Sequence, residues 1–490
     1  MSTSNFSRRN FLKTSAAAAA CLWGASSRVL GANEDIRIGM IGFRGRGKDH
    51  IENLRKLKGV RIVTLCDVDA DVLGAEAKKF ADRGEKVETC SDVRKLLEDK
   101  NIDAIASATP NHWHSLLTVW ACQAGKDVYM EKPISHNVWE GRKAVEAARK
   151  YNRIVQAGTQ SRSNPGLREA VEFIQKGGIG KVKLVRGLCY KPRNSIGKVP
   201  GEQTVPSSID YDLWTGPAEK LPLTRKSLHY DWHWVWNTGN GDLGNQGIHQ
   251  MDIARWILGE NELSPKVLSI GGRLGYVDDG QTPNTQIIYH AYAKTPLLFE
   301  VRGLSSKPES KEMDNYRGAQ IGVIAHGEEG EVVMPSYAIA IVYDKSGKEV
   351  KRFGETTNAE GKKTQVQGNH YENFINAVRS RKSTDLHADI IEGHLSSALC
   401  HTGNISHLTG KPAVPEEVRD AVKSNAELAE VVSRVQEHLG NHKIDLSSEK
   451  ITLGSWLTMD PKTERFAGNA VANALLTREY RKGFEVPEKV

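Results

Sequence analysis

Between Ile36 and Ile154 the sequence alternates short apolar runs with amphipathic segments. The runs IRIGMIGF, VRIVTLCDV, IDAIASATP and DVYMEKP have the length and composition of buried strands. Segments of helical period separate them, for example HSLLTVWACQAG, which Gly125 ends. Strands that alternate with helices form a parallel sheet with helices on both faces. The sequence therefore predicts a doubly wound α/β domain of the Rossmann type in this region.

The first strand leads directly into the turn GFRGRG, which opens a helix. In the pattern G-x-G-x-x-G, Gly42 and Gly47 hold the first and third places, and Arg44 replaces the glycine that normally admits a pyrophosphate. Gly45, the next residue, has no side chain and leaves space for the pyrophosphate beside Arg44. Asp67 ends the second strand 20 residues after Gly47, where a carboxylate meets the adenosine ribose and repels a 2′-phosphate. These residues predict NAD rather than NADP; the alternative is a fold without a dinucleotide, in which Asp67 caps a helix.

After about Gln156 the sequence changes to strand-like runs with turn-rich links. Six runs predict a mostly antiparallel sheet that is open on one face, and they read KVKLVRGLCY, PKVLSIGGRLGYV, NTQIIYHAYA, PLLFEVRGL, AQIGVIAHGEEGEVVM and AIAIVYD. Helices follow, and Pro415 opens one with the sequence EEVRDAVKSNAELAEVVSRVQEHL. We expect a polar, irregular tail after about residue 440.

The N-terminus carries an export signal. The run SRRNFLKTSAAAAACLWGASS places Arg8 and Arg9 before Phe11 and Leu12, then an Ala-rich apolar run, then small residues. This is the complete twin-arginine pattern, which exports proteins already folded in the cytoplasm, so we expect a periplasmic protein. No apolar run after residue 35 reaches the roughly 18 residues that span a bilayer, and we expect no stable membrane insertion once the signal is removed.

The composition is that of a globular protein. The formal net charge of +7 is small for 490 residues, and no Lys/Arg cluster alternates with aromatic residues, so we expect no nucleic-acid partner. Of the 6 cysteines, Cys21 lies in the signal, and the others form no C-x-x-C pair. An odd number without that spacing predicts buried thiols rather than a disulfide framework or a zinc knuckle.

From about Ile36 to Lys411 the chain resembles the glucose–fructose oxidoreductase / inositol dehydrogenase / rhizopine-catabolism family, written Gfo/Idh/MocA. The resemblance rests on the glycine-rich turn followed in order by ATPNHWH, MEKP, QAGTQSR and GNGDLGNQGIHQMD. It implies an N-terminal Rossmann domain and a C-terminal α+β domain whose open, mostly antiparallel sheet often buries itself in an oligomer. It also implies a site between the domains, where a sugar or cyclitol meets the nicotinamide.

These patterns divide the chain into four parts. We expect a twin-arginine signal peptide in residues 1–32, an NAD-binding Rossmann domain in 33–155, a substrate and oligomerisation domain in 156–411, and a helical and irregular extension in 412–490. The fold class is α/β, with a homo-dimer or tetramer as the expected assembly.

The resemblance assigns roles to single residues. Lys132 and His249 match the family's catalytic lysine and histidine. The cofactor positions are matched, besides the glycine turn and Asp67, by Thr109, Asn111, Glu131 and Gln160. On the substrate side we expect Arg162, Tyr190, Trp236 and Asp252.

One position departs from the family. Its D-x-x-x-H pattern reads here Asn245-Gln-Gly-Ile-His249. An amide orients a hydroxyl or an imidazole but takes no proton, so a proton released in a dehydrogenation goes to His249 alone or is held by Lys132. We count Asn245 among the catalytic residues; the alternative is that it caps a helix that starts near Gln246.

Other polar and aromatic residues in this region have two interpretations each. Asp252 lies three residues after His249 and therefore on the same helical face. Asp252 either orients the imidazole of His249 or forms a salt bridge with Arg255 or another basic group. We favour the salt bridge. Aromatic side chains occupy every second position in Tyr230, Trp232, Trp234 and Trp236. This spacing predicts either an aromatic face that stacks on a sugar ring or a row of side chains buried in the core. We expect no metal, although zinc-like spacings occur among His112, His114, His229 and His233.

The sequence as a whole predicts an NAD-dependent oxidoreductase that removes hydride from a sugar or cyclitol hydroxyl carbon. His249 takes the hydroxyl proton and the Lys132 ammonium stabilises the oxygen. We expect a tightly held cofactor, because little free nicotinamide lies beyond the inner membrane. One alternative is an NAD-dependent glycosidase, in which transient oxidation permits elimination of a glycosidic bond. A second is a non-catalytic sugar-binding protein on the same fold.

Overall fold

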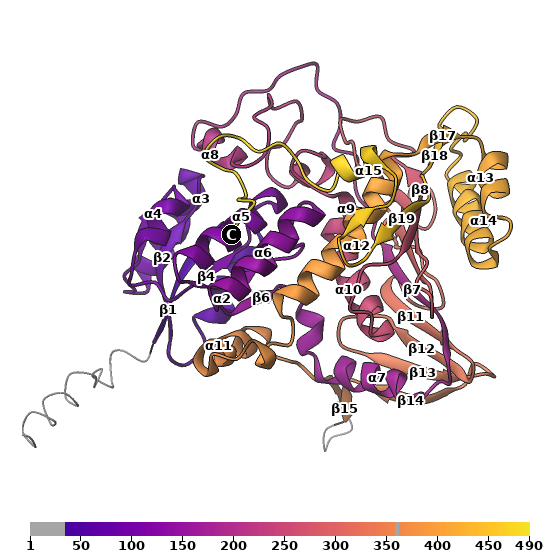
Figure 1. Ribbon diagram of the computed structural model, residues 1–490, viewed down its shortest axis with the longest axis horizontal. Helices are drawn as coiled ribbons and strands as arrows, with labels where there is room; N and C mark the ends of the chain where they lie inside the picture. The colour runs from indigo at the N-terminus through magenta and orange to yellow at the C-terminus, as the bar shows by residue number, and fades with distance from the viewer. Residues whose placement is uncertain (1–34, 358–361) are drawn as a thin grey trace, which may run out of the picture.

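A computed structural model describes residues 35–357 and 362–490, so the twin-arginine signal lies outside the described residues. Two large sheets organise these ranges, one near each end of the longest axis (Figure 1). In the part described, no helix combines the length and the apolar character needed to cross a bilayer. The predicted fold class, a parallel Rossmann sheet followed by a mostly antiparallel sheet, is confirmed.

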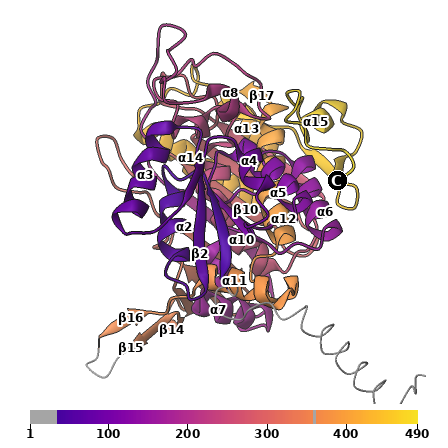
Figure 2. The ribbon, with the colours of Figure 1, turned by 90° about the vertical axis from the view of Figure 1, so that its left-hand side faces the viewer.

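The first sheet has 6 parallel strands in the order β3-β2-β1-β4-β5-β6. Its strands are β1 (Ile36–Ile41), β2 (Val60–Cys66), β3 (Glu88–Cys90), β4 (Ala104–Ser107), β5 (Asp127–Met130) and β6 (Val155–Ala157). The helices between them are α2 (Arg46–Leu54), α3 (Ala70–Asp82), α4 (Val93–Glu98), α5 (His114–Gln123) and α6 (Val138–Lys150). Seen along the sheet, α2 and α3 lie on one side of the strands and α4, α5 and α6 on the other (Figure 2).

A helix from much later in the chain completes this domain. In α11 (His370–Ser380), Tyr371 and Phe374 are buried in the same cluster as Ile51 of α2 and Tyr129 of β5. The rings of Tyr129 and Tyr371 stack with their centroids 5.1 Å apart. The sequence predicted helices after the strands of the second domain, but it could not show that one of them, α11, packs against the Rossmann sheet.

The second sheet has 12 strands, and its main path runs β14-β13-β12-β11-β7-β10-β9-β8-β18-β17. All its printed pairings are antiparallel except that of β7 with β10. The strands are β7 (Val182–Tyr190), β8 (Lys266–Gly272), β9 (Thr285–His290), β10 (Leu297–Arg302), β11 (Ile321–Gly327), β12 (Gly330–Met334), β13 (Ala340–Asp344), β14 (Glu349–Phe353), β17 (Lys411–Ala413), β18 (Ile451–Leu453), β19 (Leu457–Asp460) and β20 (Arg465–Phe466). The run expected as one strand from Ala319 is the hairpin of β11 and β12.

The remaining elements connect or cover these sheets. A small separate hairpin consists of β15 (Glu355–Thr357) and β16 (Lys363–Gln365). The helices are α7 (Pro165–Gln175), α8 (Tyr211–Thr215), α9 (Gly241–Asn245), α10 (Gly247–Leu258), α12 (Ile390–Leu408), α13 (Pro415–Val422), α14 (Ala426–Asn441) and α15 (Ala470–Ala474). Single 3-10 turns are η1 (Asn111–Trp113), η2 (Gln160–Ser163), η3 (Asp231–Trp234) and η4 (Ser383–Asp385).

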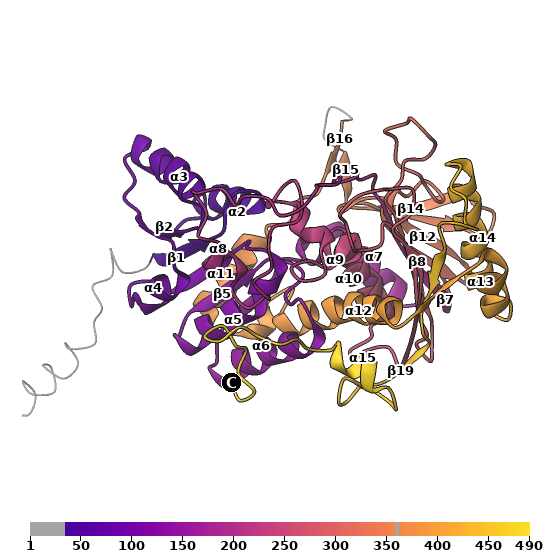
Figure 3. The same ribbon diagram turned by 90° about the horizontal axis from the view of Figure 1, so that it is seen from above.

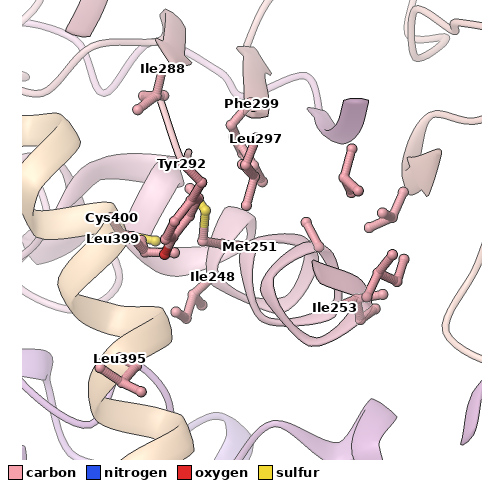
Figure 4. Close-up of a cluster of buried hydrophobic side chains, with 14 of the residues drawn as sticks. Ile248, Met251, Ile253, Ile288, Tyr292, Leu297, Phe299, Leu395, Leu399 and Cys400 are labelled. Atoms are coloured by element: carbon pink, nitrogen blue, oxygen red, sulfur yellow. The ribbon is translucent and has the colours of Figure 1, made fainter. Parts of the chain in front are cut away.

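One face of the large sheet packs against α7, α10 and α12. Ile248 and Met251 of α10 lie in one buried cluster with Phe299 of β10 and Leu399 of α12 (Figure 4). Burying a side chain of this kind contributes about 1.5–3 kcal/mol to folding. This core fixes the position of α10, the helix that carries His249.

The opposite face of the large sheet is not as open as the sequence suggested. The helix predicted after Pro415 is two helices, because Asn425 caps α14 by accepting a hydrogen bond from the Leu428 amide. Both helices cover β8, β9 and β10, with Val418 and Val431 among the buried side chains of that cluster. The C-terminal extension therefore occupies part of the face that was expected to be free.

The last part of the chain returns to the Rossmann domain. After α15 it runs back past α6 to end beside α5 (Figure 3). The ring of Phe484 meets Trp113 edge-on with the centroids 5.6 Å apart, and it lies 6.3 Å from Trp120. We call residues 477–490, which follow α15 and lie against the first domain, the C-terminal strap.

A buried carboxylate attaches α14 to the sheet. Glu300 of β10 has no exposed surface, and it accepts hydrogen bonds from Arg186 at 2.7 Å, Arg434 at 2.6 Å and the Tyr190 hydroxyl at 2.6 Å. Arg434 belongs to α14, so this carboxylate holds one of the covering helices against two strands.

We predict that Glu300→Ala lowers the free energy of unfolding by about 3–5 kcal/mol, because it leaves buried guanidinium groups without their counter-charge. Urea unfolding followed by fluorescence measures the change. The control is Glu430→Ala: Glu430 contacts both Arg186 and Arg434 from a more exposed position, and its loss costs less than about 1 kcal/mol. Equal losses in the two variants would contradict the buried role of Glu300.

Candidate active site

A cavity of about 830 Å³ lies where the carboxyl ends of the Rossmann strands meet the second domain. Ligands of doubly wound sheets bind at this edge. The cavity is lined by the glycine turn, by the residues that follow β2, β4 and β5, and by segments between 160 and 368. Among the described residues that line it are Gly42, Arg44, Gly45, Asp67, Thr109, Asn111, Glu131, Lys132, Gln160, Asn245 and His249.

The backbone of the turn after β1 requires glycine at two places. Gly42 has φ +70, a conformation that side chains disfavour, and a Cβ there would lie 3.0 Å from the Thr109 side chain. A Cβ on Gly47 would lie 2.2 Å from the carbonyl oxygen of Gly42, so only glycine lets α2 start this close to the strand. Gly45 precedes α2 without a side-chain cap. The free amides of that first turn suit an anionic pyrophosphate.

Asp67 lines the cavity at the end of β2. Its carboxylate accepts from the amide of Phe43 at 3.1 Å and from that of Asp69 at 3.0 Å. Burial raises the pKa of Asp67 to about 6. The following helix is capped by Asp69, which accepts from the Asp71 amide at 3.1 Å, so Asp67 is not its cap. The helix-cap alternative for Asp67 is wrong.

Glu131 is the most heavily contacted carboxylate in the cavity wall. One of its oxygens lies 3.0 Å from Gln160 Nε2, 3.3 Å from His50 Nε2 and 3.4 Å from Arg46 Nε. Burial disfavours the charged form, but His50, Lys132 and Arg46 together lower the pKa of Glu131 to about 2. Glu131 is therefore ionised, and it lies close to the positive charges of Lys132 and Arg46.

Lys132 connects the two domains across the cavity. Its Nζ donates to the main-chain oxygen of Asn245 at 2.9 Å and to the side-chain oxygen at 3.4 Å. Burial lowers the pKa of Lys132. Asn245 ends α9, and its amide nitrogen lies 3.5 Å from a carboxylate oxygen of Asp242. The N-cap interpretation of Asn245 is wrong, because α10 starts after Gln246 and has no side-chain cap.

His249 lies on the first turns of α10, and its ring meets that of Tyr337 edge-on with the centroids 5.4 Å apart. Burial and the charge of Lys132 lower the pKa of His249 to about 3. The imidazole is therefore neutral near pH 7 and has a nitrogen free to accept a proton. Lys132 and His249 come from different domains and line one cavity.

A long connection of the second domain lies over the part of the cavity near the ends of β2 and β4. We call residues 205–236 the cover segment. The Asp210 amide donates to the Val68 carbonyl at 3.0 Å, and His229 Nε2 lies 3.0 Å from the Asp69 carboxylate. The Trp113 indole donates to the Trp214 carbonyl at 3.0 Å. These contacts join the cover segment to the ends of β2 and β4, and nothing in the sequence indicated them.

The aromatic run in the cover segment does not form one face. A 3-10 turn, η3, replaces the expected extended strand, and Tyr230 before it has φ +64. Tyr230 and Trp232 line the cavity, whereas Trp234 is buried outside its lining. Trp236 is also outside the lining, with its ring centroid 6.5 Å from that of His407. The turn breaks the period of two, so the common face was a wrong expectation.

Three other residues expected on the substrate side lie elsewhere. Asp252 has no exposed surface and accepts from Arg162 Nε at 2.9 Å, so the salt-bridge interpretation of Asp252 is confirmed with Arg162 as the partner. Arg162 also lies 3.0 Å from Glu392. Tyr190 belongs to the buried network of Glu300. We correct their assignment: buried carboxylates need partners, and here Arg162 supplies the cation for Asp252 while Tyr190 donates a hydrogen bond to Glu300.

The four histidines with zinc-like spacing have other partners. His112 Nε2 lies 3.0 Å from the Trp214 carbonyl, and His114 Nε2 lies 2.8 Å from the Thr109 carbonyl. His229 contacts Asp69, as described above, and His233 contacts the Tyr230 carbonyl. In the described ranges, no group of three or more His, Cys, Asp or Glu side chains is arranged to hold a metal ion.

Sequence reasoning missed part of the cavity wall. The missed residues lie in short or irregular segments without a recognisable pattern, and they include Asn164, Leu213 of α8, Tyr337, Gln367 and Gly368. Only the tertiary structure brings them to the Rossmann domain.

Comparison with known families agrees with this architecture. Residues 36–159 match the oxidoreductase family, NAD-binding Rossmann fold, and residues 181–294 match the C-terminal alpha/beta domain of the same family. The chain belongs to the Gfo/Idh/MocA oxidoreductase family, and its first domain is an NAD-binding Rossmann domain. Residues 5–22 match the twin-arginine translocation signal, which directs export.

Curated relatives are distant. A levoglucosan dehydrogenase of Pseudarthrobacter phenanthrenivorans is 24% identical over 281 residues, 55% of this chain and 63% of that protein. A myo-inositol 2-dehydrogenase of Thermotoga maritima is 26% identical over 226 residues, 46% of this chain and 55% of that protein. The chain thus spans little more than half the length of these relatives.

A solved structure shares the fold. The WlbA dehydrogenase from Bordetella pertussis, crystallised with NADH and UDP-GlcNAcA, has a TM-score of 0.55 and 20% sequence identity, and the match covers 74% of this chain and 94% of that one.

The buried histidines predict how stability depends on pH. Burial lowers the pKa to about 3 in His112, His233, His249, His290 and His401. An unfolded chain binds these protons near pH 6.5. The stability contribution is therefore complete above about pH 6.5 and is lost progressively as the pH falls toward 3.

Thermal unfolding midpoints measured between pH 7.5 and 5 should fall with pH. The variant His290→Gln lies outside the cavity lining and should show a shallower slope, because one such histidine is gone. A midpoint that is independent of pH would contradict the prediction.

Proposed function

We propose that the protein is an NAD-dependent oxidoreductase that acts on a hydroxyl carbon of a sugar or cyclitol. The observation that carries this proposal is the convergence of Lys132 and His249 on the cavity at the carboxyl edge of the Rossmann sheet. Two features support the cofactor: a Cβ at Gly42 or Gly47 would fill the turn, and Asp67 directly follows β2, the position from which a carboxylate bonds the adenosine ribose in folds of this type. NAD, when bound, supplies the acceptor for the hydride.

The chain's own residues handle the proton. A carbinol loses hydride only if its hydroxyl proton leaves to a base. His249 is neutral and accepts that proton, while the ammonium of Lys132 stabilises the substrate oxygen as it gains negative charge. Negative charge on that oxygen offsets the charge of Lys132, which raises the proton affinity of His249 during the step. Asn245 holds Lys132 in place through two oxygens but takes no proton.

The cavity near His249 favours a neutral polyol. Besides the charged Lys132 and Glu131, the lining includes uncharged aromatic and amide side chains from the second domain, among them Tyr230, Trp232, Tyr337 and Gln367. Aromatic faces suit the C–H sides of sugar rings, and amide and hydroxyl groups suit their hydroxyls. The names of the relatives, levoglucosan dehydrogenase and myo-inositol 2-dehydrogenase, support the same class.

The cofactor is tightly held in this proposal. The cover segment lies over the adenosine end, and the C-terminal strap holds the cover in place. Arg481 donates to the Asp212 carboxylate at 2.6 Å, and Phe484 packs on Trp113. The twin-arginine pathway carries folded proteins, so a cofactor enclosed in the cytoplasm leaves with the chain.

We also infer the setting of the enzyme. Export points to the periplasm as the destination. The four-part division at residues 32, 155 and 411 remains our proposal for the domain boundaries, with α11 packed on the first domain. The part of the large sheet that α13 and α14 leave uncovered is the proposed contact for a homo-dimer or tetramer.

A second candidate is a redox-neutral glycosidase. The amide at Asn245, where the family has a carboxylate, and the enclosed cofactor site favour a hydride that returns to the same substrate. Transient oxidation then acidifies a neighbouring C–H bond, and elimination breaks the glycosidic bond. p-Nitrophenyl glycosides separate the candidates: aglycone release without net NADH indicates the glycosidase, and net NADH from free sugars or inositols indicates the dehydrogenase. Sugar binding without either product would indicate a non-catalytic protein.

We predict that Lys132→Met and His249→Gln each lower kcat/KM by about 10²–10⁴-fold, whichever chemistry operates, because each removes a proton-transfer or charge-stabilising group. The loss is measured as the steady-state rate on the glycoside, free sugar or inositol that the unchanged protein converts. The bound nucleotide, quantified after denaturation, should stay the same.

The matched control is Lys143→Met. Lys143 pairs with Glu146 on α6, outside the cavity lining, and its loss should leave the rate unchanged. Full activity in Lys132→Met would rule out the proposed mechanism.

We predict that the double variant Arg481→Ala, Phe484→Ala releases NAD at least about tenfold faster, because it detaches the strap from the cover segment; a factor of ten corresponds to about 1.4 kcal/mol. Loss of bound nucleotide during gel filtration, timed by absorbance, measures the rate. Val471→Ala, an exposed position on α15, is the control. Equal release rates would show that the strap does not retain the cofactor.

A further inference from the structure

Two cysteines lie side by side at the rim of the cavity. β2 ends at Cys66 and the neighbouring parallel strand β3 ends at Cys90, and the two residues are register partners. Side chains of register partners point to the same face of a sheet. The two thiols therefore lie on one face of the sheet, close enough for each to shift the pKa of the other.

The backbone geometry suits a covalent bond between them. Neighbouring strands lie about 4.7–4.9 Å apart, and disulfides join Cα atoms about 4.4–6.8 Å apart. Both cysteines are free thiols in this structure.

The environment supplies a nucleophile with access to solvent. Cys90 is half-buried, whereas Cys66 is buried and lines the cavity. The hydrogen bond from Cys66 lowers the pKa of Cys90, and the same contact raises that of Cys66. The thiolate is the form that attacks a disulfide. Cys90 is therefore the residue that reacts first.

We propose that Cys66 and Cys90 form a reversible disulfide by exchange with a small external disulfide such as oxidised glutathione. The Cys90 thiolate attacks one glutathione sulfur and releases glutathione thiolate, which leaves a mixed disulfide on Cys90. The Cys66 thiol gives its proton to solvent and attacks the Cys90 sulfur, and the second glutathione leaves. Two protein thiols are oxidised and one glutathione disulfide is reduced to two thiols.

The proposed disulfide lies next to Asp67, a residue of the proposed cofactor site. Asp67 follows Cys66 directly, and its amide donates to the Cys90 carbonyl at 3.3 Å. The bond therefore ties β3 to the carboxylate that faces the adenosine ribose, and we expect it to change the affinity for NAD. This consequence rests on the proposed function, whereas the bond itself does not. Exported proteins meet conditions in which disulfides persist.

Peptide mapping of the full mature chain tests the proposal. The protein is incubated with oxidised glutathione, denatured, alkylated and digested. The expected product is a peptide pair joined through Cys66 and Cys90, with both thiols lost to alkylation and both restored by a reductant. Cys90→Ser should abolish the joined pair, and Cys122→Ser, a change on α5, should retain it.

Three results would overturn the proposal: both cysteines remain fully alkylated, Cys90 carries glutathione without a bond to Cys66, or Cys66 is joined to another cysteine. The wild-type map decides among these results even if a variant fails to fold. NAD binding by the reduced protein, titrated in parallel, tests the proposed function separately. A joined pair in a protein that never binds NAD supports the disulfide and removes its proposed consequence.

Discussion

The hydrogen bond from Lys132 to the main-chain oxygen of Asn245 spans the cavity between the two domains. Lys132 follows the last residues of β5, and Asn245 ends the short helix before α10. An ammonium that is removed from water needs oxygen partners, and here they come from the other domain. The contact holds Lys132 in the cavity that His249 lines, where burial first and then the charge of Lys132 lower the pKa of the imidazole. Lys132 also contributes to both shifted groups of the site, after His50 in lowering the pKa of Glu131 and after burial in lowering that of His249.

The parts of the chain with the least regular sequence have a large share in closing this site. The cover segment crosses from the second domain to the ends of β2 and β4, and the strap leaves α15 next to α6, where the Trp139 amide donates to the Leu476 carbonyl at 2.9 Å. Arg481 and Phe484 bring the two together near Trp113. In the other direction, α13 and α14 use an ion-paired network around Glu300 to cover a sheet face. The long C-terminal extension thus serves both domains.

Much of the fold could be predicted, because it depends on local patterns. Alternating strand and helix periods identified the Rossmann sheet, and the glycine turn with Asp67 identified its ligand-binding edge. The failures have a common cause. Asp252 and Arg162 sit near motif residues in the sequence, but their charges pair with each other in the core. The aromatic run after His229 has a strand-like period, yet a positive φ at Tyr230 and a 3-10 turn redirect it. A local sequence pattern does not reveal which distant residue a side chain contacts in the folded protein.

By itself the sequence determined the export signal, the order of strands and helices, the type of dinucleotide domain and the family. Each of these depends on residues close together in the chain: backbone freedom at Gly42, the spacing to Asp67, and apolar periodicity. The tertiary structure alone decided that Asn245 holds Lys132 instead of capping a helix, and that a cover and a strap enclose the cavity. It also placed Cys66 beside Cys90. These depend on contacts between residues far apart in the chain, whose free energy comes from burial and charge pairing that no local pattern encodes.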